Sequence, residues 1–116
     1  METITALKAL AALAQHSRLA IFRHLVEVGP EGAFAGKIAE ALDIAAATLS
    51  FHVKELAHAG LVESEQTGRF IRYRANYEAM NALVGYLTEN CCGGQPQLCA
   101  PACAPATPKP RQNAAR

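Results

Sequence analysis

The sequence has no uncharged apolar run long enough to cross a membrane, although 51% of its 116 residues are hydrophobic. A membrane-spanning helix needs about 20 consecutive apolar residues. Residues 1–4 are also not followed by the basic segment, apolar stretch and small-residue cleavage site of a secretory signal. We therefore expect a soluble, cytoplasmic protein that has no membrane partner.

Motifs of the common enzyme classes are absent from the sequence. It has no glycine-rich nucleotide loop and no Cys-x-x-Cys beside a βαβ pattern. None of its cysteines precedes the five-residue loop and arginine that hold an oxyanion in thiol phosphatase-like reductases. We expect a protein that is not an enzyme and that uses no organic cofactor.

The first ninety residues contain no cysteine, whereas the last quarter contains four: Cys91, Cys92, Cys99 and Cys103. Soft thiolates favour thiophilic ions. Trivalent arsenic or antimony bonds three sulfurs in a pyramid and needs no fourth ligand. Cys91, Cys92 and Cys99 form a natural triad for such an ion, and Cys103 either substitutes for Cys99 or is spare.

Other chemistries compete for the same cysteines. All four cysteines could together hold zinc, cadmium or copper, although adjacent ligands strain a tetrahedral site. A thiol redox switch would pair Cys91 or Cys92 with Cys99 or Cys103, because adjacent cysteines close a strained ring. A thiol-rich protein that sequesters metalloids is a third possibility.

Length and patterning predict one domain over residues 1–90, followed by a cysteine-containing, Pro/Ala-rich tail over residues 91–116. Apolar residues recur at helical spacing from Thr3 to Ala14, and we expect the stripe of this helix to be buried. The stripe consists of Ile4, Leu7, Leu10 and Leu13. Ser17 is the expected N-cap of a second helix that stops at Gly29.

Two short helices follow, one over residues 34–42 and one that ends at Gly60, and their close succession indicates a helix-turn-helix. The apolar period then changes to two, which predicts a β-hairpin that turns at residues 66–68. A last helix is expected from Tyr77 to Asn90. The fold class is therefore mainly α with a β-hairpin, a winged helix-turn-helix.

The helix that ends at Gly60 carries short polar groups and a cation away from its apolar stripe, so it fits the major groove of DNA. The arginines of the hairpin are candidate phosphate ligands. His52 lies beside the apolar stripe, so it is either a buried, hydrogen-bonded histidine or a DNA contact. Arg72 either contacts phosphate or is only solvated. The candidate DNA-binding residues are Thr48, Ser50, Phe51, His52, Lys54, Arg69 and Arg72.

Residues 48–56 and 59–62 closely resemble the recognition helix and the start of the wing in the ArsR/SmtB family of winged-helix metalloregulatory repressors. Residues 68–74 resemble the wing tip and returning strand, and residues 16–19 resemble the start of the second helix, so the resemblance covers about residues 5–90. It implies a homodimer with a helical interface, built from the first and last helices, that binds pseudo-palindromic operator DNA. The chain departs from the family at residues 45–47, where three alanines replace polar residues.

An arsenic-responsive subgroup of that family carries an adjacent cysteine pair after the last helix and a third cysteine later, which resembles Cys91, Cys92 and Cys99. The family's arsenic site on the third helix is absent, because residues 37–43 contain no cysteine. Its zinc site on the last helix is also absent, since residues 76–90 contain no histidine. The resemblance implies a repressor that leaves DNA when As(III), or Sb(III), binds to the tail.

Overall fold

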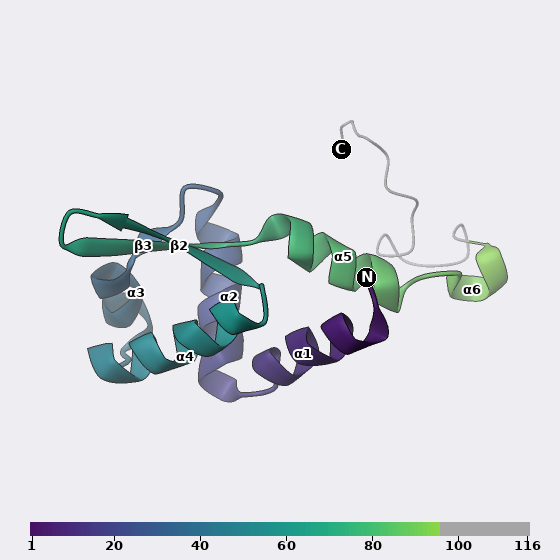
Figure 1. Cartoon of the computed structure of the whole chain (residues 1–116), viewed down its shortest axis with the longest axis horizontal. Helices are drawn as coiled ribbons and strands as arrows, with labels where there is room; N and C mark the ends of the chain where they lie inside the picture. Colours follow the sequence, from purple (N-terminus) through teal and green to yellow (C-terminus); the bar gives the residue numbers. More distant parts are fainter. Residues whose placement is uncertain (96–116) are drawn as a thin grey trace. The chain divides into compact units, whose positions relative to one another are not determined.

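Five helices and a β-hairpin follow the expected order in the computed structural model, which describes residues 1–95 and adds a two-residue strand and a short sixth helix (Figure 1). The chain divides into two compact units, Met1–Leu83 and Val84–Arg116. The elements are α1 (Thr3–Leu13), α2 (His16–Val28), β1 (Ala33–Phe34), α3 (Ala35–Leu42), α4 (Ala46–His58), β2 (Val62–Thr67), β3 (Phe70–Ala75), α5 (Tyr77–Leu87) and the short α6 (Cys91–Gly94). The mainly helical winged helix-turn-helix fold is confirmed.

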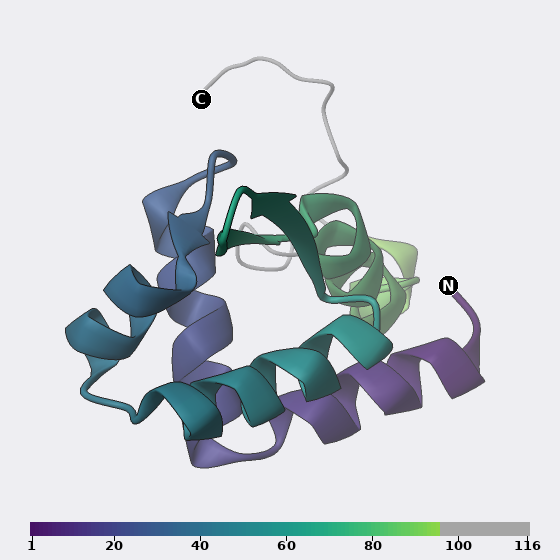
Figure 2. The same cartoon turned by 60° about the vertical axis from the view of Figure 1, so that its left-hand side comes forward.

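The core of the first unit lies where α1, α2, α3 and α4 meet (Figure 2). Its largest fully buried side chains are aliphatic, and those on α2 and α4 recur at helical spacing, as in helices that bury one face. They are Ile21, Leu25, Ile38, Leu49, Val53, Leu56 and Leu61. The core therefore fixes α4 against α2 and α3, with one face of α4 turned outward.

The sheet has three antiparallel strands in the order β1-β3-β2. The sequence pattern did not reveal β1, because a strand of two residues has no visible period. Gly32, just before β1, has φ 74°, and a Cβ at this position would collide with the Tyr73 carbonyl oxygen and lie 2.9 Å from the Arg74 Cβ. Only glycine allows β1 to approach β3 this closely.

The wing turn is shorter than expected. β2 continues through Gln66 and Thr67, and Thr67 pairs with Phe70 across a two-residue turn. Gly68 takes φ 63° at the first turn position, where type II′ hairpin turns require glycine. The turn is therefore Gly68-Arg69, and the hairpin extends farther than the pattern indicated.

Two helix boundaries also differ from expectation. The predicted Ser17 cap is wrong, because α2 begins at His16 and the Gln15 side chain accepts a hydrogen bond from the Arg18 amide at 2.8 Å. Gln is an uncommon cap, so the sequence signal for Ser prevailed in the prediction. The helix predicted to end at Asn90 is α5, which ends at Leu87. Just after this end, the Thr88 hydroxyl donates a hydrogen bond to the Val84 carbonyl at 2.8 Å.

The stripe of α1 is the largest difference between expectation and structure. Its alanine face is buried, at Ala6, Ala9 and Ala12. Ile4, Leu7 and Leu10 instead remain 69%, 59% and 38% exposed. The prediction that the stripe is buried is wrong for these three residues within a single chain, because small residues let α1 approach its neighbours more closely than leucines would.

Candidate nucleic-acid interface and thiol pair

Four of the predicted DNA-binding residues are exposed on α4, and three of them are polar or charged. Thr48, Ser50 and Lys54 are exposed, while Leu49, Val53 and Leu56 hold the opposite face in the core. The first turn has no side-chain cap, since Ala45 is the N-cap residue. Hydroxyl groups and an ammonium on an exposed, firmly packed helix suit contacts with base edges and phosphates.

Phe51 and His52 form an aromatic pair on the same helix. Phe51 is 59% exposed, and its ring lies edge-on to the His52 ring with centroids 5.4 Å apart. His52 is half-buried, and its Nδ1 lies 3.3 Å from Nη1 of Arg18. His52 is thus hydrogen-bonded within the chain and also partly accessible, so a DNA contact by His52 stays a prediction.

The wing arginines have different surroundings. Arg69 is exposed in the turn between β2 and β3. Arg72 lies 4.7 Å above the Phe34 ring and donates to the Glu31 carbonyl at 3.2 Å. Arg69 is therefore the better placed of the two for phosphate, while Arg72 contributes a cation–π contact that joins β3 to β1.

Arg74 is tied to the neighbouring strand of the wing. Its Nε lies 3.3 Å from Glu63, and its Nη1 lies 3.4 Å from Glu65. The two acidic partners both belong to β2, whose register places them opposite β3. These exposed ion pairs add little stability, and both of them engage the charge of Arg74 within the wing.

Cys91 and Cys92 lie in the second unit, in the short segment α6. Asn90 and Cys92 both adopt left-handed conformations, with φ 57° and 56°, as do the following glycines. The two sulfur atoms are 3.4 Å apart. This backbone brings two adjacent thiols into contact, which an extended chain with alternating side chains would not do.

The neighbouring Cys92 affects the pKa of the Cys91 thiol. A hydrogen bond with Cys92, together with desolvation and repulsion from the Cys92 charge, raises the pKa of Cys91 above its usual value. Protonated thiols are poor nucleophiles. Cys91 therefore holds its proton more firmly at neutral pH than an ordinary cysteine.

Alkylation should reveal the raised pKa of Cys91. At pH 7.5 we expect iodoacetamide to modify Cys91 more slowly in the wild-type chain than in Cys92→Ser, because Cys92 raises the pKa of Cys91 and leaves a smaller thiolate fraction there. The difference should narrow as the pH rises through that pKa, since Cys91 then ionises. Tandem mass spectrometry of the two briefly treated full-length proteins measures the modification of Cys91, and equal or faster modification in the wild-type chain would contradict the assignment.

The remaining predicted ligands, Cys99 and Cys103, lie outside the described residues. Within residues 1–95, no three His, Cys, Asp or Glu side chains gather into a group that could hold a metal ion. No helix in that range has the length and apolar character needed to cross a lipid bilayer. A three-sulfur site that includes Cys91 and Cys92 needs a third thiol from Cys99 or Cys103, since the chain has four cysteines.

Arg18 is a residue of this surface that the sequence reasoning did not select. It lies on α2, yet its guanidinium reaches both the Ala12 carbonyl and His52. A contact between residues 34 positions apart leaves no trace in periodicity or spacing. The only sequence signal was its place in the segment 16–19, which resembles the second helix of the ArsR/SmtB family.

Comparisons with known proteins agree with the fold. Residues 13–65 match a family model described as a helix-turn-helix domain. An ArsR-like transcriptional regulator from Rhodococcus sp. RHA1 is 28% identical and superposes with a TM-score of 0.67, covering 82% of this chain and 87% of its own. No curated protein sequence matches the chain.

Two further solved structures share the architecture. A winged helix-turn-helix DNA-binding domain from Mycobacterium bovis is described as homodimeric and as a possible ArsR-family transcriptional regulator. It is 26% identical, covers 78% of this chain and 84% of its own, and gives a TM-score of 0.60. HlyU from Vibrio cholerae N16961 is 24% identical with a TM-score of 0.61, covers 75% of this chain and 97% of its own, and supports the fold alone.

Proposed function

We propose that this chain, a winged helix-turn-helix transcriptional regulator of the ArsR-like type and not an enzyme, is a repressor that responds to As(III). In this proposal it binds operator DNA as a homodimer in the cytoplasm and releases the DNA when its C-terminal cysteines bind trivalent arsenic. The contact between the Cys91 and Cys92 sulfurs, at 3.4 Å, is the observation that carries the arsenic assignment.

The DNA-binding part of the proposal rests on α4 and the wing turn. Thr48, Ser50 and Lys54 are exposed on α4, a geometry suited to the major groove. Arg69 is exposed in the wing turn, where a cation would meet the phosphate backbone. We assign base contacts to α4 and phosphate contacts to Arg69.

The homodimer is supported by the exposed stripe of α1. Ile4, Leu7 and Leu10 recur every three residues and remain accessible along one helix face. Scattered surface leucines need no explanation, but a continuous apolar stripe marks an interaction site. A second copy of the chain is the proposed occupant, by analogy with the neighbour from M. bovis that is described as homodimeric.

The chemistry of the thiol pair fits a small thiophilic ion. Sulfurs that share one ion through bonds of about 2.3 Å lie less than about 4 Å apart, so the observed separation of 3.4 Å suits chelation. When arsenous acid, As(OH)3, reacts with three thiols, three As–S bonds form, three As–O bonds break and three water molecules leave. Each thiol proton joins a leaving hydroxyl group to form water, so the protonated Cys91 is a competent reactant.

Release of DNA follows if the ion binds the DNA-free form more tightly. In our proposal, arsenic joins Cys99 to Cys91 and Cys92 beside the end of the last helix, and the two recognition helices of the dimer change their separation. Couplings of this kind are typically about 1–3 kcal/mol, which corresponds to about 5- to 150-fold in affinity. Cys103 replaces Cys99 or is spare.

A mobility-shift titration of the DNA upstream of the protein's own gene tests the proposal. Arsenite, antimonite, cadmium, zinc, copper(I) and an oxidant are added in parallel to the preformed complex. We expect arsenite, and antimonite next, to lower affinity about tenfold or more. If only zinc, cadmium, copper(I) or the oxidant releases the DNA, that agent is the inducer and As(III) is not. If the protein shifts no DNA fragment, a metalloid-sequestering protein is favoured.

A further inference from the structure

We propose that Arg18 is a positioning residue for DNA recognition, which fixes His52 in the tautomer whose Nε2–H donates a hydrogen bond to an acceptor on operator DNA. The inference rests on the DNA-binding part of the proposed function and is independent of the arsenic site. It concerns two side chains on different helices, joined at the place where α1, α2 and α4 meet.

The Arg18 guanidinium makes two directional contacts. Its Nε donates to the Ala12 carbonyl at 2.6 Å, and its Nη1 lies 3.3 Å from Nδ1 of His52. Ala12 is in the last turn of α1, where the carbonyl groups have no partner within the helix. Arg18 therefore caps α1 with one nitrogen and contacts α4 with another.

The chemistry of arginine decides the tautomer of His52. A guanidinium has donors only and stays charged, so the Nδ1 atom facing it must act as the acceptor. A neutral imidazole that accepts at Nδ1 carries its proton on Nε2. The contact with Arg18 thus leaves His52 with one outgoing group, the Nε2–H donor.

The ring of His52 is also held from its own helix. The Phe51 ring packs edge-on against it with centroids 5.4 Å apart, and the side chain of His52 stays half-buried beside the Val53 and Leu56 stripe. A donor fixed by a neighbouring helix and a neighbouring ring loses little entropy on binding. His52 is half-buried, so part of its side chain remains accessible.

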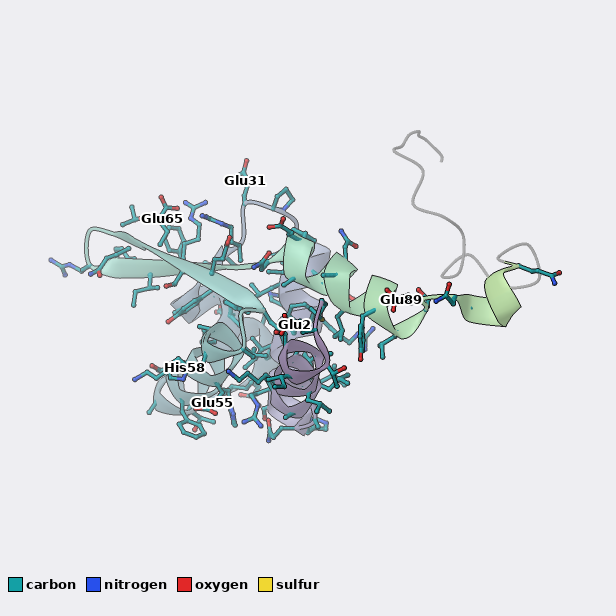
Figure 3. All side chains as sticks on the ribbon, turned by 45° about the vertical axis from the view of Figure 1, so that its right-hand side comes forward. Glu2, Glu31, Glu55, His58, Glu65 and Glu89 are labelled. Atoms are coloured by element: carbon teal, nitrogen blue, oxygen red, sulfur yellow. The ribbon has the colours of Figure 1, made fainter. Side chains whose placement is uncertain are left out.

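The surroundings of Arg18 show that the junction is polar on its outer side. A surface hollow of about 430 Å³ is lined by α1, α2 and α4 residues, among them Lys8, Arg18, Glu55 and His58. Glu55 and His58, both labelled in Figure 3, belong to α4. Arg18, which belongs to α2, therefore contacts both α1 and α4 at this junction.

The first test is spectroscopic and needs no DNA. In the full chain, the nitrogen-15 signals of His52 should identify Nδ1 as unprotonated and Nε2 as protonated. Arg18→Gln should shift these signals toward a mixture of tautomers, whereas Arg23→Gln, on the exposed side of the same helix, should leave them unchanged. A protonated Nδ1 in the wild-type chain would overturn the proposal.

The second test uses operator affinity. Asn at position 52 can place an acceptor near Nδ1 but no donor near Nε2, and Gln can place a donor near Nε2. We expect His52→Asn to bind operator about tenfold more weakly than His52→Gln, and Arg18→Gln to lose about tenfold. Equal affinity of the two His52 variants, or wild-type affinity in Arg18→Gln, would overturn the proposal.

The same titrations identify the acceptor. If it is a phosphate oxygen, His52→Asn should weaken binding equally to operator and to a scrambled duplex; if it is a base edge, the loss should be confined to operator. If the wild-type chain binds no fragment, the proposed function fails, while the nitrogen-15 experiment still decides whether Arg18 fixes the tautomer of His52.

Discussion

Replacing Cys92 by serine should leave operator binding intact and abolish the response to arsenite. Serine is similar in size to cysteine, and position 92 belongs to the second compact unit, whereas α4 and the wing turn belong to the first. The variant retains Cys91 and the two later cysteines, but the contact of two sulfurs at 3.4 Å is gone. In mobility-shift titrations, arsenite should weaken the wild-type complex about tenfold or more and the variant complex less than about twofold.

The matched controls use the other cysteines. Cys91→Ser should behave as Cys92→Ser does, while Cys103→Ser should keep the arsenite response, because Cys99 remains to complete the triad. Loss of DNA binding in Cys91→Ser or Cys92→Ser without arsenite would show that the thiol pair also shapes the reading surface. A full response in both of these variants would refute arsenic binding at this pair.

Leu7→Glu should convert the dimer to a monomer and lower operator affinity about 100-fold. Leu7 is 59% exposed in the single chain, so the substitution should leave the fold of each chain unchanged. In a dimer formed through α1, the carboxylate would lose water without gaining a partner. A monomer also loses the advantage of two linked half-site contacts, which is commonly about 10² to 10⁴ in affinity.

Analytical ultracentrifugation and mobility shift measure the two effects on one sample. Thr5→Glu is the control, because it adds the same charge to the exposed surface of α1 outside the stripe of Ile4, Leu7 and Leu10. Circular dichroism should be the same for all three proteins. A Leu7→Glu chain that still sediments as a dimer would place the interface elsewhere.

Periodicity was sufficient for the winged helix-turn-helix, because the long helices and the hairpin each repeat their apolar residues at one spacing. It failed on α1, where two faces are apolar and only packing decides which is buried: the small Ala6, Ala9 and Ala12 face inward. It also missed β1, whose two residues are defined by pairing with Tyr73 and Arg72 on β3. These features depend on contacts distant in sequence.

In the candidate site, too, some features follow from periodicity and others depend on contacts that are distant in sequence. Exposure of Thr48, Ser50 and Lys54 follows from the helical period, and the structure places them accordingly. The partners of Arg72, which are the Phe34 ring and the Glu31 carbonyl, depend on how the loop before β1 folds back onto the sheet. No local pattern contains that information.

Gly32 lies just before β1, the strand that connects the sheet to helix α3. Because any side chain there would strike Tyr73 and Arg74, β1 lies directly against β3, and α3 starts at the next residue after β1. A methyl group would wedge the loop outward and draw Phe34 from beneath the Arg72 guanidinium. A side chain at position 32 would therefore disturb both the sheet of the wing and the start of α3.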